Sequence, residues 1–385
     1  KSLKMSPSQF GIAVSAYAFS AGASGLLTAG FADKFDRKKL LTFFYTGFII
    51  GTVFCGIANS FETLVAARIV TGIFGGVIGS ISMAIVADLF AIQQRGRVMG
   101  FLQMGFGASQ VLGIPIGLYL ANRWHWHTPF LWIAAMAAVI LLLIFAKLRP
   151  VTYHLVAGER KNPLRHLLHT IAKRDYRIGF TATALLSIGG FMMMPFGSAF
   201  AINNLKITNE QLPLVFMCAG VATLVIMPFM GKLADKVDKF RLFTVSCFWM
   251  IAVVLIYTRF SVSPLWLVIM FNILMMVGIT GRMVPSTAMV TAVPAMQDRG
   301  AFMSINSSLQ MIAGGIAAAA AGTIVVQRTH TSPLEHYATL GYIVSGITLL
   351  SIFLMYRVNR MIRLRITEEK PGQQLPDDHV TLTEV

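Results

Sequence analysis

Two arginines lie inside long apolar stretches of this sequence, where a charged side chain is costly. Arg68 lies in the stretch 62–88, and Arg282 lies in the stretch 264–290. An ionisable side chain within a membrane-spanning helix usually marks a pathway or finds a buried partner. We therefore predict that both arginines contact a substrate or take part in coupling. Snorkelling of Arg68 to the membrane surface near Glu62 is the structural alternative.

The acidic residues are distributed differently, since none of the sixteen falls near the middle of an apolar stretch. Proton-driven carriers commonly use a carboxylate that gains and loses a proton within the membrane. Two buried cations without a buried acid would instead suit an anionic solute, because that solute could supply the missing negative charge. Proton coupling and anion binding are therefore both open from the residues alone.

The sequence contains no constellation typical of an enzyme or a metal site. The eight histidines lie in loops, at helix edges or in the tail, and the three cysteines lie inside apolar stretches without metal-ligand spacing. The G-x-x-x-x-G-K-[ST] loop of ATP-hydrolysing proteins is also missing from the sequence. We predict no enzymatic activity, no metal and no other cofactor.

A charged loop after the first apolar stretch carries a second candidate chemistry. It contains Asp33 and Arg37, and a carboxylate there can meet the positive end of a neighbouring helix while a guanidinium pairs with another acid. Asp88, near the end of its own helix, is the predicted partner of Arg37, and Arg95 is a second cation in the same layer. We predict that these residues form an ionic gate, with Asp235 as a weaker counterpart in the second half.

The composition of the chain indicates a membrane protein. Hydrophobic residues make up 56% of the sequence, charged residues make up 12%, and the mean hydropathy is +0.69. A soluble fold of this size could not bury so much apolar surface. Eleven charge-poor stretches are long enough to cross a hydrocarbon core as helices. They span about 9–31, 41–59, 62–88, 98–121, 129–146, 178–203, 211–230, 242–258, 264–290, 301–325 and 337–356.

The two halves of the sequence repeat each other at an offset of 202 residues. Nine identities between 3–42 and 205–244 follow this offset, including Asp33 with Asp235. A spacing near half the chain indicates two fused bundles, which is a common plan of transporters. Because an apolar stretch precedes only the second copy, we expect a further helix upstream of Lys1, in a segment of roughly 25 residues.

The positive charge follows the expected membrane topology. The net charge is +16, and six strips that share one side of the membrane hold 24 of the 32 Lys and Arg residues. The positive-inside rule makes that side cytoplasmic. Membrane orientation thus accounts for the charge without a nucleic-acid partner, and Lys38 and Lys39 are expected to do no more than set this orientation.

These patterns divide the chain into four segments. We expect an N-terminal bundle over 1–146, a cytoplasmic linker over 147–177, a C-terminal bundle over 178–357 and a disordered cytoplasmic tail over 358–385. Within the linker, apolar residues recur at helical spacing over 164–171 among basic ones, which predicts a short amphipathic helix at the lipid interface. A surface anchor is its expected role, and a regulatory site is the alternative.

The charged loops of the two halves resemble a known family signature. The loop 29–39 reads Ala-Gly-Phe-Ala-Asp-Lys-Phe-Asp-Arg-Lys-Lys and resembles the motif G-x-L-a-D-r-x-G-r-k between helices two and three of the major facilitator superfamily. A weaker echo occupies 231–239 at the equivalent point of the second half. The sequence departs from the motif at Ala29 and Asp36, which occupy its two glycine positions.

Three further motifs resemble those of the same family. Arg68, with a glycine four residues later, resembles its helix-four motif. Gly113, Pro115 and Gly117 resemble the helix-five motif of its antiporters, though an Ile separates Gly113 from Pro115. Because proline kinks a helix and glycine lets it bend, we expect a hinge here. The resemblance implies that the helix around Arg282 is the tenth of the family fold, which lines the central cavity. The alternative is that Arg282 only reaches water in the cytoplasmic funnel.

The resemblance is specifically to the bacterial drug-exporter branch, and it implies an all-α membrane protein of two six-helix bundles, of which eleven helices are present here. It implies a secondary active transporter that exports small amphipathic molecules by rocking alternating access and proton antiport. The alternative is a carrier for an organic anion, metabolite or lipid-like solute without a proton site in helices 2–12. A non-transporting receptor is a further alternative.

The expected partners are a small-molecule substrate, the proton and the lipid bilayer. The protein is expected to be a multi-pass monomer of the bacterial inner membrane with a cytoplasmic C-terminus.

Overall fold

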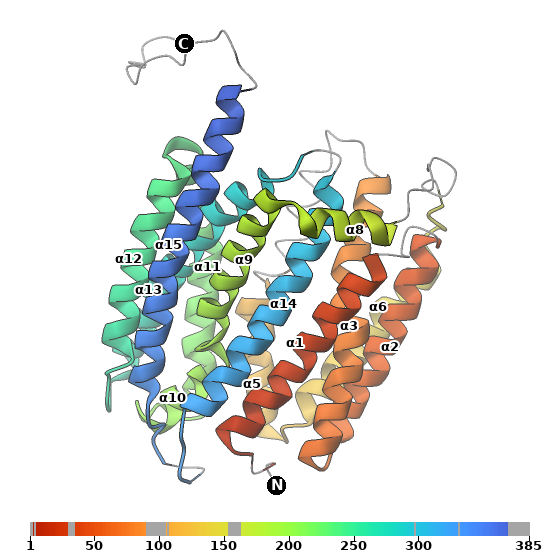
Figure 1. Ribbon diagram of the computed structural model, residues 1–385. Coiled ribbons are helices and arrows are strands. Elements are labelled where there is room, and N and C mark those ends of the chain that lie inside the picture. The colour runs from red at the N-terminus through yellow and green to blue at the C-terminus, as the bar shows by residue number, and fades with distance from the viewer. Residues whose placement is uncertain are drawn as a thin grey trace, which may run out of the picture.

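The described secondary structure is helical throughout, apart from one isolated bridge between Val326 and Glu335. Within the described part of the chain, ten helical segments are long and apolar enough to cross a membrane. This observation confirms the all-α membrane fold expected from the hydropathy pattern (Figure 1). The computed structural model describes residues 3, 5–29, 35–89, 105, 108–152, 163–295, 298–329 and 332–368.

The first half of the chain forms one group of helices. The helix α3 packs against α1 and α2, and α2 also packs against α6. Buried Leu40, Phe44 and Val77 form part of the apolar cluster between α2 and α3. The predicted span 98–121 is described only at residue 105 and from residue 108 onward. The elements are α1 (Pro7–Ala29), α2 (Arg37–Ile57), α3 (Phe61–Leu89), the π-helix η2 (Ser109–Gly113), α5 (Ile114–Arg123) and α6 (Thr128–Lys147).

The second half forms a second group of helices. The helix α9 packs against α14 and α15, while α13 packs against α11 and α12. Its largest apolar cluster includes the buried side chains of Phe200, Tyr257 and Leu340. The elements are α9 (Arg174–Phe191), the 3-10 turn η3 (Met194–Phe196), α10 (Gly197–Asn203), α11 (Leu212–Lys236), α12 (Lys239–Tyr257), α13 (Leu265–Thr291), α14 (Arg299–Ile324) and α15 (Tyr337–Glu368).

One predicted helix is interrupted in the structure. The hydropathy pattern predicts a single helix over 178–203, whereas α9 ends at Phe191 and α10 begins at Gly197. Pro195 lies in the 3-10 turn between them, and a proline has no backbone N–H with which to continue the helical hydrogen bonds. The two pieces together are still long enough to span the membrane.

The last helix extends farther than expected. α15 continues to Glu368, so residues 358–368 are helical and the expected start of a disordered tail at 358 is wrong. Val358 is fully buried in the cluster around Phe243, because apolar residues alternate with arginines at helical spacing and continue the packed face of the helix. Residues 369–385 of the expected tail lie outside the described residues.

The linker contributes a short helix, α8 (Pro163–Ala172), that lies across one end of the molecule (Figure 1). We call this the linker end, and the opposite end, where α10 lies, the far end. Leu168 and Ile171 of α8 are exposed, whereas Thr170 is buried. The helix predicted within the linker is therefore present, and it packs against the end of the bundle that contains α14 and α9.

Among the described elements, two sets of helices form the main contacts between the halves. The first is α1 with α14, and the second is η2 and α5 with α11. A Cβ atom added at Gly11 would lie 2.7 Å from the carbonyl oxygen of Ala318, and one added at Gly22 would lie 2.8 Å from that of Ser308. Only glycine therefore permits this backbone approach. The sequence repeat relates α1 to α11 and α5 to α14, so the two contacts are equivalent under the repeat.

Candidate functional site

The charged residues at the linker end form a network that starts with Arg37. The Nε atom of Arg37, the first residue of α2, lies 3.1 Å from Oδ2 of Asp88 near the end of α3. The two side chains are only 8% and 19% exposed, so water screens the pair weakly. The structure thus brings together the two residues that the sequence pairs in a predicted gate.

Asp36 explains why Arg37 is held in this position. Its side-chain Oδ1 accepts hydrogen bonds from the backbone N–H groups of Lys38 and Val151, each at 2.9 Å. The backbone N–H of Arg37 donates to the carbonyl oxygen of Val151 at 3.2 Å. Asp36 therefore caps α2 and fastens the segment after α6 to the first turn of that helix.

Of the other predicted gating residues, only Asp235 lies in the described part of the chain. Asp33 and Arg95 lie outside the described residues. Asp235 is exposed in the last turn of α11, and within the described part of the chain no hydrogen bond or ion pair engages its carboxylate. Its counterpart in the repeat, Asp33, is not described, so a gating role of Asp235 stays a prediction.

Asp238 takes the structural role in the second half. It caps α12 by accepting from the backbone N–H of Arg241 at 2.9 Å, and it pairs with Nη2 of Arg363 in α15 at 2.6 Å. Burial alone would raise the pKa of the Asp238 carboxyl, but these two donors outweigh it and lower the pKa. The repeat identity of Asp36 with Asp238 is the sequence signal that could have revealed this pair of caps.

A second buried carboxylate at the linker end was not expected from the sequence. Asp298, directly before α14, is 2% exposed. Its Oδ2 atom lies 2.5 Å from Nζ of Lys173 and accepts a 2.7 Å hydrogen bond from the hydroxyl of Tyr176. The hydrogen bond to Asp298 raises the pKa of Lys173. This cluster ties the start of α9 to the start of α14.

Arg68 points from α3 toward α1. Its Nε atom donates to the carbonyl oxygen of Ala13 at 3.4 Å, and its guanidinium carbon lies 4.9 Å from the ring centroid of Tyr17. A carbonyl dipole and an aromatic face both stabilise a cation. The side chain thus has described partners inside the bundle, and these partners account for its position without snorkelling toward Glu62.

Arg282 lies inside the second group of helices, on α13. It is 6% exposed, and its Nη1 atom donates to Oγ1 of Thr348 on α15 at 3.3 Å. A Cβ added at Gly189 of α9 would lie 3.9 Å from Nη1, so the glycine leaves room for the guanidinium. In this conformation the guanidinium thus has neighbours on α9 and α15, and its place in the wall of the central cavity stays a prediction.

The predicted hinge coincides with an irregular helix. Residues Ser109–Gly113 form a π-helix turn that leads directly into α5, whose first turn contains Pro115. A Cβ added at Gly117 would meet no atom within 4 Å, and one at Gly113 would meet only the side chain of Ser109. Packing against the described residues therefore does not require these glycines, and π turns often mark functional irregularities in a helix.

Comparison with known proteins places this geometry in a family. The model of the Major Facilitator Superfamily matches residues 1–178 and 179–380. The uncharacterized MFS-type transporter YceJ of Bacillus subtilis is 27% identical over 59% of this chain and 58% of its own length. A bicyclomycin resistance protein homolog of Haemophilus influenzae is 27% identical over 60% of this chain and 58% of its own length.

The crystal structure of a D-xylose–proton symporter superposes with a TM-score of 0.74 at 15% identity, covering 91% of this chain and 88% of that chain. This likeness shows that the helices share one fold. The sequence matches span less than two thirds of the two curated relatives. They therefore support membership of a family and do not show a particular activity.

Proposed function

The chain belongs to the major facilitator superfamily, and from this premise we propose that it exports small amphipathic molecules by proton antiport. It is a multi-pass membrane transporter and not an enzyme, as its family and relatives show. A relative named for bicyclomycin resistance supports export of a small molecule rather than uptake. We place the protein in a bacterial inner membrane as a monomer, with the linker end and the C-terminus in the cytoplasm.

The observation that carries the proposal is the pair of equivalent contacts between the halves. Alternating access requires two rigid groups of helices that rock about a shared interface. The pairs α1 with α14 and α5 with α11 offer that interface, and the π turn with Gly113, Pro115 and Gly117 would let one member bend. Arg37 and Asp88 would then act as a latch at the cytoplasmic end, together with Asp33 and Arg95.

A specific observation favours the anion carrier as the second candidate. Within the described residues, Arg68 and Arg282 are hydrogen-bonded only to neutral groups, namely the carbonyl of Ala13 and the hydroxyl of Thr348. A buried cation gains most from an anionic partner. An organic anion that reached either guanidinium during the transport cycle would supply that charge.

Transport in proteoliposomes containing the full-length protein tests both candidates. Antiport predicts drug movement that depends on an imposed pH gradient and persists, at altered rate, in Arg68→Gln and Arg282→Gln. Gradient-independent uptake of an organic anion that disappears in Arg282→Gln would overturn the antiporter in favour of the anion carrier. Unchanged transport in both variants would assign the two arginines to structural roles.

A further inference from the structure

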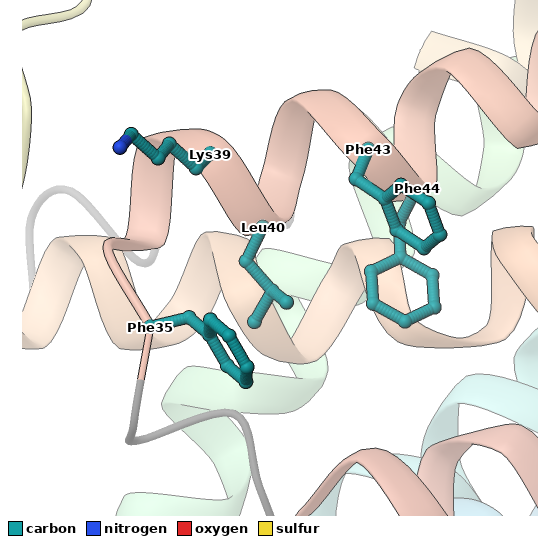
Figure 2. Close-up of a pocket in the computed structure, with 5 residues that line it drawn as sticks. All are labelled: Phe35, Lys39, Leu40, Phe43 and Phe44. Atoms are coloured by element: carbon teal, nitrogen blue, oxygen red, sulfur yellow. The ribbon is translucent and has the colours of Figure 1, made fainter.

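Two adjoining cavities open on the surface of α2 at the linker end. Figure 2 shows the first, of about 300 Å³, lined by aromatic and aliphatic side chains with one lysine. The second, of about 460 Å³, lies beside it and shares Lys39 and Phe43 with it. Neither is lined by the buried arginines of the proposed pathway. The first is lined by Phe35, Lys39, Leu40, Phe43 and Phe44, and the second by Asp36, Lys38, Lys39, Thr42, Phe43, Phe145 and Pro150.

The walls of these cavities combine exposed aromatic rings with free positive charge. Phe43 is 62% exposed and Phe35 is 52% exposed, and they lie within two turns of Lys39. In the described part of the chain no hydrogen bond or ion pair engages the ammonium of Lys39. Lys38 donates to the carbonyl oxygen of Phe145 at 3.1 Å, which holds a second ammonium at the rim.

The one acid in the cavity walls does not cancel this charge. Asp36 is buried, and its Oδ1 atom is engaged by the backbone N–H groups of Lys38 and Val151. The first turn of α2 also presents the positive end of its helix dipole. The field at the rim is therefore positive, while the interior of both cavities is largely apolar.

We propose that these cavities form a binding site for one anionic phospholipid, with the phosphate at Lys39 and Lys38 and the upper acyl chain along Phe43 and Phe35. The exposed rings and the two lysines in the first turn of α2 match a molecule with one charged and one apolar end. A soluble anion would use the lysines but leave the aromatic groove empty.

The second half of the repeat supplies an internal comparison. At the offset of 202 residues, Lys39 corresponds to Arg241, so the cation is kept. Phe35, Phe43 and Phe44 correspond to Val237, Val245 and Ser246, so every ring of the groove is lost. The aromatic groove is therefore a property of α2 and not a general consequence of the fold.

Lipid binding to the detergent-solubilised full-length protein, measured by native mass spectrometry, tests the site. We expect phosphatidylglycerol to bind more tightly than phosphatidylcholine. Lys39→Gln should weaken phosphatidylglycerol binding about fivefold, the effect of one lysine beside an anionic lipid surface. Phe43→Ala should weaken binding of both lipids, and Arg241→Gln, which removes a cation at the equivalent position, should change neither.

Three results would overturn the proposal. Equal losses in Lys39→Gln and Arg241→Gln would mean that net charge alone attracts the lipid. Displacement of phosphatidylglycerol by inorganic phosphate would identify an anion site without an acyl-chain groove. Equal binding of the two lipids to the wild-type protein would mean that no anionic headgroup is recognised.

Discussion

At the scale of single residues, the pair of Arg37 with Asp88 depends on the residues that hold it. Asp36 caps α2 and fixes the direction in which Arg37 leaves the helix. The guanidinium is then buried against α3, where it has Asp88 as its carboxylate partner. Loss of the carboxylate would remove this anionic partner from a buried cation, and breaking a buried ion pair on one side is costly.

We expect Asp88→Asn to lower thermal stability and to impair turnover more than expression. The loss of a hydrogen bond between charged groups in a part-buried site corresponds to about 2 kcal/mol. Thermal unfolding in detergent and transport by reconstituted protein measure the two effects. Asp235→Asn is the matched control, because that exposed acid has no described partner, and an equal loss in the control would argue against the latch.

A histidine pair at the far end gives a prediction for pH. His127 Nε2 lies 2.7 Å from the carbonyl oxygen of Ala58, which can only accept, so Nε2 carries the proton. His127 Nδ1 is then the acceptor for Nδ1–H of His125, at 2.8 Å. Partial removal from water lowers the pKa of His125, and the facing His127 lowers it further.

The folded state lowers the pKa of His125, so it favours the neutral imidazole. The neutral side chain therefore stabilises the fold above the unfolded-state pKa of about 6.5, and this stabilisation is lost as pH falls through the folded-state pKa. The thermal midpoint should therefore drop more between pH 8 and pH 5 in the wild type than in His125→Gln. His169→Gln, which changes an exposed histidine of α8, should keep the wild-type slope. Parallel slopes in wild type and His125→Gln would rule out this contribution.

At the scale of helices, the close contact between α1 and α14 depends on glycines, which have no side chain. A Cβ at Gly22 would lie 2.5 Å from Cγ1 of Ile312 and 2.8 Å from the backbone oxygen of Ser308. The second of these neighbours cannot turn away. The two helices would have to separate to admit a methyl group.

Gly22→Ala should therefore destabilise the protein by about 1–3 kcal/mol, the usual cost of overpacking. Gly346→Ala is the control, since its Cβ would meet no atom within 4 Å and an alanine in a helix is then stabilising by about 0.5–1 kcal/mol. Thermal unfolding of both variants provides the comparison. Similar stability changes in the two variants would contradict the close backbone approach.

At the scale of the whole molecule, two contacts at the far end connect the halves. Nδ2 of Asn122, in the last turn of α5, donates to the backbone oxygen of Asn209 at 2.7 Å. The rings of Phe10 and Phe196 meet edge to face with centroids 5.9 Å apart. An exporter that alternates its access must break both contacts in each cycle.

The double variant Asn122→Cys with Asn209→Cys should therefore stop transport when oxidised and recover it when the disulfide is reduced. The two single variants should transport normally under both conditions. Substrate flux in proteoliposomes, with the disulfide followed by gel mobility, provides the measurement. Full transport by the cross-linked protein would mean that the far end need not open.

Much of this molecule could be predicted from local sequence. A bilayer demands about twenty apolar residues per helix and internal hydrogen bonds for every backbone group, so the spans can be read from hydropathy alone. The duplication and the family signature can also be recognised from the sequence alone. The pairing of Arg37 with Asp88 could be predicted because both residues lie at predicted helix ends.

Only the tertiary structure decided which way the helices face. The sequence places Arg282 at a depth in the membrane, but the rotation of α13 determines that its guanidinium meets Thr348 within the second group of helices. The partners Lys173 and Asp298 are separated by 125 residues, and no local pattern links them. Hydropathy and charge are properties of a segment, whereas the direction of a side chain depends on packing between segments, and this is why the positions of the charged partners could not be read in advance.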